Sequence, residues 1–400
     1  MTSFASLGLT EPLLKALDKQ GYQEPTSIQN KAIPIALKGE NLIAAAQTGT
    51  GKTASFVLPV LQRLAGSETQ KKKRVRAVIL VPTRELAIQV DKAIAAYGEF
   101  IGLKSCAIYG GVEYAGQKQA LIEGLDIVVA TPGRLIDLYG QRSVYFEEVE
   151  VLVLDEADRM LDMGFIEDIN KLIDCMPRDI QNLLFSATLS NPVRDLAKTA
   201  IDQAHEIVLA KYDASKENIS QWITTVDKDK KSALLSHLLL NNDWSQVLIF
   251  IETKHGAAKL VQQLEKRGIS AEAIHSGRNQ AARTRVLEQF KQGDVRYLIA
   301  TGVAARGIDI DALPCVINYD LPYPADEYIH RIGRTGRAGS AGQAISLVSK
   351  DDFKNLCMIE SRLGKLLERR VIEGFEPRKE VPISILNYVP KHKRNKPESI

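Results

Sequence analysis

The strongest constraint on the fold is a repeated alternation of short apolar runs with longer helical patterns. Between about residues 40 and 190 we expect strands at Leu42–Ala46, Ala77–Val81, Ile127–Ala130, Val151–Leu154 and Asn182–Phe185. The alternation starts again with Val247–Ile251, Ala271–Ile274, Tyr297–Ala300, Cys315–Asn318 and Ala344–Val348. Runs that are apolar at consecutive positions fit strands buried on both faces of a parallel sheet. The two series therefore predict two α/β domains, each a mainly parallel sheet with helices on both faces.

The expected domain boundaries lie where this alternation breaks. The segment at 211–218, Lys-Tyr-Asp-Ala-Ser-Lys-Glu-Asn, lacks apolar periodicity. We place the N-terminal domain at 1–210, a linker at 211–217 and the C-terminal domain at 218–372. Residues 373–400 contain four prolines and a basic cluster at Lys391, Lys393, Arg394 and Lys396. This composition predicts an extended, basic and partly disordered tail.

Composition excludes several classes of protein. No apolar run approaches the length of a membrane span, and the first residues lack the pattern of a secretory signal. The cysteines at 106, 175, 315 and 357 are far apart, which argues against a disulfide framework or a cysteine metal site and favours the reducing cytoplasm. Because the net charge is only +3, binding of nucleic acid would need a local basic surface.

Residues 151–158 read Val-Leu-Val-Leu-Asp-Glu-Ala-Asp, so an apolar run ends abruptly in three carboxylates. Open α/β sheets bind ligands at the carboxyl ends of their strands, where Asp155 is expected to lie. Clustered carboxylates repel one another unless a cation or a proton relieves the repulsion. This run alone fits either a metal–phosphate site or a polar loop after a core strand. A phosphate-binding segment elsewhere in the chain decides between the two.

Residues 46–53 provide such a segment, since they read Ala-Gln-Thr-Gly-Thr-Gly-Lys-Thr between an expected strand and an expected helix. This is the pattern of a P-loop, with Ala46 in place of its first glycine. Gly49 and Gly51 permit tight backbone angles that turn amide N–H groups towards phosphate oxygens. We expect Lys52 to reach the β- and γ-phosphates and Thr53 to ligate Mg²⁺. The remaining members of the predicted ATP-binding loop are Gln47, Thr48 and Thr50.

The P-loop suggests separate roles for the three carboxylates. Asp155 is expected to hold Mg²⁺, partly through water, and Glu156 to orient or deprotonate the attacking water. Asp158 is too far along the chain for the same metal, and we expect it to contact a neighbouring motif. One such motif, Ser186-Ala187-Thr188, ends the fifth expected strand at the same sheet edge.

The second series carries a basic segment at 330–337, His-Arg-Ile-Gly-Arg-Thr-Gly-Arg. Arginines interleaved with glycines are unsuited to a helix interior. They suit a loop that presents guanidinium groups to phosphate oxygens. The second series contains no P-loop of its own. We therefore expect the second domain to supply arginines to the nucleotide that the first domain binds.

In this order, the motifs make the chain resemble the DEAD-box ATP-dependent RNA helicases of superfamily 2, from Phe4 to about residue 370. The segment at 21–29, Gly-Tyr-Gln-Glu-Pro-Thr-Ser-Ile-Gln, resembles the adenine motif of that family. The resemblance implies two RecA-like domains that close on ATP and RNA. It also implies that Gln29 binds the adenine edge, that Phe4 stacks on the base and that Asp309 contacts the ribose.

The same resemblance implies arginine fingers, coupling residues and RNA contacts. Arg334 and Arg337 would act on the γ-phosphate, an effect of about 10³–10⁵ in the turnover of other phosphoryl-transfer enzymes. Coupling between the domains would involve Asp158, Ser186, Thr188 and His330. Sequence-independent RNA contacts would come from Pro82, Thr83, Arg84, Gly110, Gly111, Thr131, Arg134, Gln280, Arg283 and Thr301.

The leading functional hypothesis is an RNA-dependent ATPase that unwinds short RNA duplexes or remodels RNA–protein complexes. An alternative hypothesis is an ATP-gated RNA clamp or assembly scaffold with incidental turnover. A third hypothesis is a DNA translocase. We expect a cytoplasmic monomer that uses ATP and Mg²⁺ and binds RNA through its backbone. Ribosomal or RNA-decay proteins are the protein partners that fit such an activity.

Overall fold

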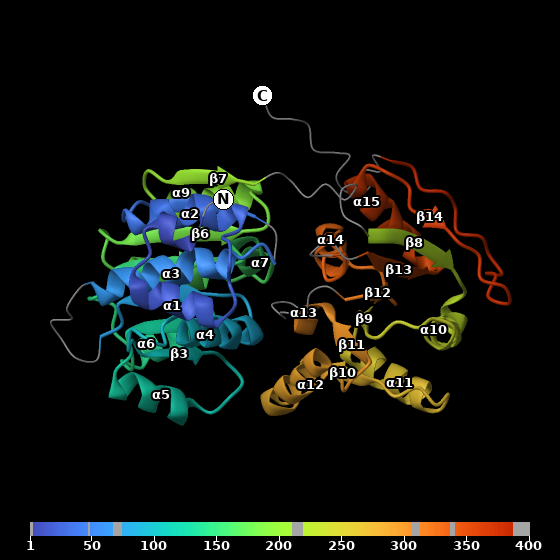
Figure 1. The fold of residues 1–400 in the computed structure, drawn as a ribbon. Coiled ribbons are helices and arrows are strands. Elements are labelled where there is room, and N and C mark those ends of the chain that lie inside the picture. Colours follow the sequence, from blue (N-terminus) through green and yellow to red (C-terminus); the bar gives the residue numbers. More distant parts are fainter. Residues whose placement is uncertain are drawn as a thin grey trace. The chain divides into compact units, whose positions relative to one another are not determined.

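The protein forms two compact units, one from residues up to 209 and the other from residues after 218 (Figure 1). The structure, a computed structural model, describes residues 3–46, 49–66, 74–209, 219–305, 313–336 and 341–386. Within these ranges no helix combines the length and apolar character that a membrane crossing requires.

Within the described residues, the first unit is built on a sheet of seven strands in the order β3-β4-β2-β5-β6-β1-β7. The strands are β1 (Leu42–Ala45), β2 (Ala77–Leu80), β3 (Ser105–Ile108), β4 (Ile127–Ala130), β5 (Val151–Leu154), β6 (Gln181–Ser186) and β7 (His205–Val208). Every neighbouring pair is parallel. All carboxyl ends therefore meet at one edge of this sheet.

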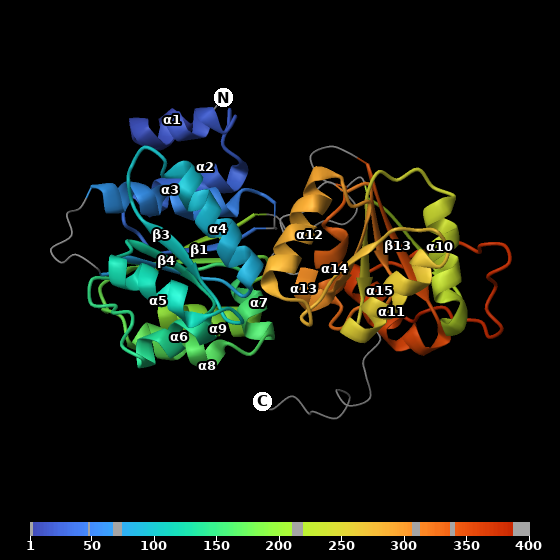
Figure 2. The same cartoon turned by 90° about the horizontal axis from the view of Figure 1, so that it is seen from below.

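Alternate residues of the central strands pack on opposite faces of the first sheet. Ala77 and Ile79 contribute to one apolar cluster, whereas Val78 and Leu80 contribute to the other. Figure 2 shows helices on both sides of the sheet. One face carries η1 (Phe4–Leu7), α1 (Glu11–Lys19), α2 (Ser27–Leu37), α3 (Lys52–Ala65) and α4 (Arg84–Tyr97). The other carries α5 (Tyr114–Glu123), α6 (Pro132–Gly140), α7 (Ala157–Asp162), α8 (Ile166–Asp174) and α9 (Asn191–Ala200).

The described part of the second unit repeats this plan, with a parallel seven-stranded sheet in the order β10-β11-β9-β12-β13-β8-β14. Its strands are β8 (Ile219–Thr225), β9 (Val247–Ile251), β10 (Glu272–Ile274), β11 (Tyr297–Thr301), β12 (Cys315–Asn318), β13 (Gly342–Val348) and β14 (Glu368–Arg369). Its helices are η2 (Lys228–Lys230), α10 (Lys231–Leu240), α11 (Lys254–Glu265), α12 (Gln280–Gln292), α13 (Gly302–Ala305), α14 (Asp326–Ile332), η3 (Lys350–Asp352) and α15 (Phe353–Leu363). Helices α10 and α11 pack on one face of the sheet.

These two sheets confirm the expected fold class, with two parallel sheets that each carry helices. The expected strands are all present, four of them (β4, β5, β9 and β12) with the expected bounds. Strands β3, β7, β8 and β14 have no counterpart among the expected strands. Strand β7 shows why, since three of its four residues are exposed and its sequence, His-Glu-Ile-Val, lacks a continuous apolar run.

Two segments differ from their expected conformation. The loop expected over 330–337 is wrong at its start, because α14 continues through His330 and Arg331 and ends at Ile332. The segment expected to form a partly disordered tail, 373–400, differs from that expectation over its described part, up to residue 386. Its first part packs on the second unit: Val381 and Ser384 are buried, and Arg369 donates to the carbonyl oxygens of Val381 and Pro382 at 2.6 Å each. The basic cluster and the predicted linker lie outside the described residues.

Candidate active site

The P-loop of the first unit runs from the carboxyl end of β1 to the amino end of α3. Gly49 and Gly51 both adopt positive φ, +79° and +89°, which a residue with a side chain rarely adopts. Gly51 is the N-cap of α3, so the first residues of that helix are Lys52 and Thr53. A helix N-terminus carries partial positive charge and unsatisfied N–H groups. The local geometry is therefore that of an anion-binding loop.

Gln29 links the adenine motif to this loop. Its Nε2 donates to the Gly51 carbonyl oxygen at 3.2 Å, and its Oε1 accepts from the Thr26 N–H at 2.8 Å. A Cβ at position 51 would lie 2.4 Å from Gln29 Nε2, so only glycine fits there. Phe4, the predicted base-stacking residue, is 5% exposed and belongs to the apolar core of the first unit.

Lys52 is a buried cation at the start of α3. Its side chain is 6% exposed, and within the described residues Nζ has no hydrogen-bond partner. A buried ammonium without hydrogen bonds is costly unless a ligand supplies the acceptors. The position of Lys52 at the start of α3 therefore suits a phosphate oxygen of a bound nucleotide.

Asp155 follows β5 at the same sheet edge and is 3% exposed. Burial raises the pKa of Asp155 to about 7, with Lys52 opposing the shift and with Glu156 and Asp158 adding to it. A proton thus relieves part of the carboxylate repulsion when no ligand is present. Among the described residues there is no cluster of three or more metal-binding side chains. The donor set fits Mg²⁺, which keeps several waters and often uses only one or two protein carboxylates.

Glu156 occupies a left-handed backbone conformation, with φ +53° and ψ +48°. Such a conformation costs roughly 1 kcal/mol or more for a residue with a side chain, and often occurs at functional sites. The Glu156 carboxylate lies 3.4 Å from Arg159 Nη1, and both side chains are almost fully buried. The backbone and Arg159 together define the position of this carboxylate.

Asp158 is hydrogen-bonded to the segment after β6. Its Oδ2 accepts from both the N–H and the hydroxyl of Thr188, each at 3.0 Å. Ser186 Oγ accepts from the Asp158 N–H at 3.4 Å and donates to the Thr188 carbonyl oxygen at 2.7 Å. The contact of Asp158 with a neighbouring motif is therefore confirmed. Its role in coupling remains a prediction.

The predicted RNA residues of the first unit lie at the carboxyl edge of its sheet, after β2, β3 and β4. Thr83 caps α4, accepting from the Leu86 N–H at 3.3 Å, and Pro82 is buried beside it. Arg84 lies against Gly111, where a Cβ would come within 2.5 Å of its guanidinium. Gly110 faces open space. Thr131, also at this edge, is the N-cap of α6.

Arg134 differs from the expectation of an exposed phosphate ligand. It is 7% exposed and donates to Gln117 Oε1 at 3.2 Å and to the Val112 carbonyl oxygen at 3.1 Å. Its guanidinium also lies 4.0 Å from the centroid of the Tyr114 ring. Arg134 therefore holds the segment between β3 and α5 in place.

The second unit gathers its predicted RNA residues at the ends of β10 and β11. Gln280 begins α12, Arg283 lies one turn later, and Thr301 ends β11; all three are buried. Burial, followed by the nearby cations Arg278, Lys254 and Arg283, lowers the pKa of His275. The surroundings of His275 are consequently positive, as a phosphate-binding edge requires.

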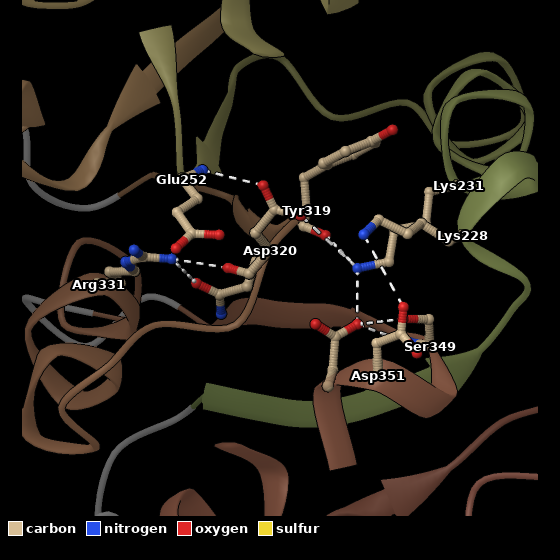
Figure 3. A network of polar contacts seen from close by, with 10 residues as sticks. Lys228, Lys231, Glu252, Tyr319, Asp320, Arg331, Ser349 and Asp351 are labelled. Carbon is tan, nitrogen blue, oxygen red and sulfur yellow. Dashed lines mark hydrogen bonds and ion pairs between the residues drawn. The ribbon is translucent and has the colours of Figure 1, made fainter. Parts of the chain in front are cut away.

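A polar network supports the predicted arginine segment of the second unit (Figure 3). Arg331 on α14 donates to the Asp320 carbonyl oxygen at 2.9 Å and lies over the Phe250 ring. The Asp320 carboxylate accepts from the Glu252 N–H at 2.9 Å and lies 3.7 Å from Lys231 Nζ. Arg334, the first predicted finger, is 5% exposed and follows α14 directly.

Some predicted site residues cannot be placed. Gln47, Thr48, Asp309 and Arg337 lie outside the described residues. Thr50 and His330 are half-buried in the P-loop and in α14 respectively.

Arg159, Asp320 and Tyr114 belong to these polar contacts but were not predicted from the sequence. Arg159 follows the carboxylates Asp155 and Glu156, and Asp320 follows the buried strand β12; that proximity is the signal that could have identified them. The position of Tyr114 depends on contacts with Arg134 and Asp137 of α6, which a single sequence does not reveal.

Comparison with known proteins agrees with this geometry. Residues 26–196 match the family model of the DEAD/DEAH box helicases, and residues 229–339 match that of the helicase conserved C-terminal domain. The chain is 38% identical to the DEAD-box ATP-dependent RNA helicase CshA of Geobacillus kaustophilus, across 92% of this chain and 78% of that protein. It is 40% identical to the ATP-dependent RNA helicase CshA of Listeria monocytogenes, across 92% of this chain and 70% of that protein.

Solved structures with the same fold were determined with nucleic acid and nucleotide analogues bound. S. cerevisiae Dbp5 bound to RNA and ADP BeF3 matches with a TM-score of 0.82 and 33% identity, covering 93% of this chain and 96% of that one. The helicase Mss116 bound to ssRNA and UDP-BeF matches with a TM-score of 0.83 and 27% identity, covering 94% and 81%. Both units of the present chain are thus RecA-like. The chain belongs to the DEAD-box ATP-dependent RNA helicases, enzymes that couple ATP hydrolysis to the unwinding of RNA.

Proposed function

We propose that the first unit binds and hydrolyses ATP at the edge formed by the P-loop and the end of β5. The observation that carries this proposal is the buried Lys52 Nζ, which has no acceptor among the described residues and lies at a helix N-terminus beside Asp155. The phosphates of ATP supply the missing acceptors. Gln29 would bind the adenine edge, with Phe4 and Asp309 completing the nucleoside contacts.

Mg²⁺ fits the same edge, where Thr53 and Asp155 would hold it, partly through water. When bound, the ion would neutralise charge that develops on the phosphates. Glu156 would orient the attacking water and accept its proton. The strained backbone at Glu156 and its contact with Arg159 support this role, because both restrict where the carboxylate can lie.

RNA would gate this reaction through closure of the two domains, which we propose extend over 1–210 and 218–372. Arg334 and Arg337 would reach the γ-phosphate only in the closed state, so hydrolysis would depend on RNA. Asp158, Ser186, Thr188 and His330 would transmit the change between domains. The hydrogen bonds between Asp158 and Thr188 support such a connection on the side of the first domain.

The RNA strand would lie on the edges that carry Arg84, Gly110 and Gly111 in the first domain and Gln280, Arg283 and Thr301 in the second. Glycines let a backbone approach closely, and arginines pair with phosphates without reading sequence. The basic residues at 391–396 would add non-specific affinity. The enzyme would act as a cytoplasmic monomer, with RNA-processing or ribosomal proteins as partners.

Multiple-turnover unwinding of a short RNA duplex tests this proposal, with ATPase activity measured with RNA, with DNA and without nucleic acid. Glu156→Gln should retain ATP and RNA binding and lose both turnover and unwinding. Equal unwinding by the wild type and the variant would favour a clamp that needs no hydrolysis. Equal stimulation by DNA and RNA would contradict an RNA-specific enzyme.

A further inference from the structure

The segment after β3 and the first turn of α5 line an open depression. Two of its lining side chains, Tyr114 and Lys118, are not among the predicted RNA residues. Its volume is about 730 Å³, and it is lined by Gly111, Val112, Glu113, Tyr114, Ala115 and Lys118. Pockets of roughly 300–1,000 Å³ accommodate small organic ligands. The depression therefore has room for one nucleotide of a single strand.

Tyr114 is an exposed aromatic residue held in a fixed position at this depression. Its side chain is 38% exposed, although its hydroxyl donates to Asp137 Oδ2 at 3.3 Å. The Arg134 guanidinium lies 4.0 Å from the ring centroid. Because Arg134 is itself anchored on Gln117 and Val112, it forms a rigid support for the ring. An aromatic surface ordered in advance loses little conformational entropy on binding.

The neighbouring charges favour a nucleic-acid strand, since two cations, Lys118 and Arg84, outnumber the one carboxylate of the lining, Glu113. Lys118 Nζ lies 5.9 Å from the Tyr114 ring centroid, and Arg84 lies against Gly111 on the other side of the segment. Gly110 faces open space, so a sugar–phosphate backbone can pass close to the main chain. Rings flanked by cations are typical of proteins that bind single strands, where bases stack without sequence preference.

We propose that Tyr114 and Lys118 form a subsite for one nucleotide of single-stranded RNA, in which the base stacks on the Tyr114 ring and Lys118 pairs with an adjacent phosphate. Arg134 acts as a positioning residue, supporting the ring from within. This subsite rests on the proposed RNA binding at the carboxyl edge of the first domain. It extends that binding from backbone contacts to stacking on a base.

The chain offers a matched control for this subsite. Tyr145 is 40% exposed, and the Arg74 guanidinium lies 4.1 Å from its ring centroid. This pair has the same chemistry as Tyr114 and Arg134. However, Tyr145 and Arg74 precede β5 and β2, so they lie at the amino edge of the sheet, away from the predicted RNA residues.

The test measures the dissociation constant of a fluorescent single-stranded RNA by anisotropy in the full chain. Loss of stacking on one base should make Tyr114→Ala bind about 5- to 150-fold more weakly. Tyr114→Phe, which keeps the ring, and Tyr145→Ala should bind like the wild type. Lys118→Gln should reduce the slope of log affinity against log salt by about 0.7. Tyr114→Ala should leave that slope unchanged.

A second measurement uses the wild-type protein and so remains informative if Tyr114→Ala fails to fold. A series of RNAs, each lacking one base at a different position, should contain one position at which affinity falls as far as it does in Tyr114→Ala. At that position the losses of binding free energy caused by Tyr114→Ala and by the missing base should not add, because both changes remove the same contact.

Several outcomes would overturn the subsite. They are unchanged affinity in Tyr114→Ala, an equal loss in Tyr145→Ala, or an abasic series without a sensitive position. These results differ from failure of the proposed function, in which the wild type itself would not bind RNA.

Discussion

Lys52 shows how a single side chain can be placed for a ligand at the expense of its own solvation. The ammonium is almost fully buried, and no acceptor among the described residues replaces its lost water. Buried charges are ordinarily paired and hydrogen-bonded. The side chain is therefore best explained by the phosphate that it would bind, and not by a contribution to stability.

Replacing Lys52 with methionine should separate catalysis from stability. Methionine fills similar space without the charge, so the melting temperature should change little. RNA-stimulated ATP turnover should fall by about 10² or more, as expected for loss of an electrostatic contact to the reacting phosphates. Lys31→Met, at an exposed position of α2, serves as the control and should retain activity. Normal turnover in Lys52→Met would contradict the assignment of the P-loop.

Arg159→Met should lower kcat with little change in the KM for ATP, because Arg159 forms an ion pair with Glu156, the residue proposed to orient the attacking water. Misplacement of a catalytic group by about 1 Å can cost up to about 10²-fold in rate. Arg159→Lys keeps a cation and should recover part of the loss. Steady-state ATPase kinetics at saturating RNA measure both parameters. A raised KM with an unchanged kcat would assign Arg159 to nucleotide binding instead.

At the scale of elements, Lys231 joins α10, β12 and η3 of the second unit. Its side chain is 4% exposed, and its Nζ donates to the Tyr319 carbonyl oxygen and to Asp352 Oδ2, each at 2.9 Å. Burial raises the pKa of Asp352, but Lys231 and the hydrogen bonds from Ser349 outweigh it and hold this pKa below its usual value. The pair therefore stabilises the fold only when Asp352 is ionised.

Asp352→Asn should destabilise the second unit by about 3 kcal/mol at pH 7, because it leaves a buried lysine without its closest carboxylate. Since the folded pKa is depressed, the stabilisation is present above about pH 4 and is lost as the pH falls further. The free energies of unfolding of the wild type and the variant should thus become similar in acid. Urea unfolding followed by tryptophan fluorescence reports this unit, because both tryptophans, Trp222 and Trp244, lie in it.

The neighbouring Asp351 provides the control for this measurement. It lies on the same short helix, but its ion pair with Lys228 is 3.9 Å long and highly exposed. Exposed pairs contribute little, so Asp351→Asn should unfold like the wild type at every pH. If the free energies of unfolding of the wild type and Asp352→Asn differed by the same amount from pH 7 to acid, ionisation of Asp352 would not be the source of the stabilisation.

The elements also show how far a sequence can predict this fold. Strand β5 and the carboxylates after it were predictable because a fully buried strand is a continuous apolar run. Strand β8 was not, because Ile-Ser-Gln-Trp-Ile-Thr-Thr mixes polar and apolar residues, and strand β14 has only two residues. The P-loop was predictable from local sequence, whereas the inward turn of Arg134 depends on Gln117 and Val112, which lie far from it in sequence.

At the scale of the whole molecule, the chain after β14 folds back on the second unit. Phe375 packs on its apolar cluster and contacts His237, with ring centroids 5.4 Å apart. Arg378 forms ion pairs of 2.7 Å with Asp227 and Asp229. The second unit therefore requires residues beyond the helicase motifs.

Truncation at two points should distinguish this packed segment from the residues that follow it. A chain ending at 372 should lose about 3 kcal/mol of stability in the second unit, since it no longer buries Phe375 and Val381. A chain ending at 386 should unfold like the full chain and bind RNA with a weaker salt dependence. Tryptophan fluorescence and RNA titration measure the two effects. Equal stability of both truncated chains would show that the segment from 373 to 386 contributes nothing.

The hydrogen bond from Gln29 to the Gly51 carbonyl has a consequence for nucleotide choice. The amide that would recognise adenine already has a partner in the phosphate loop. Because Nε2 carries a second N–H, a base can accept only from that proton while the bond to Gly51 is kept, and one such hydrogen bond contributes about 1 kcal/mol. That corresponds to a preference of about fivefold at equilibrium. The contact with Gly51 would then fix the orientation of the amide for adenine, and selectivity would appear in turnover more than in affinity.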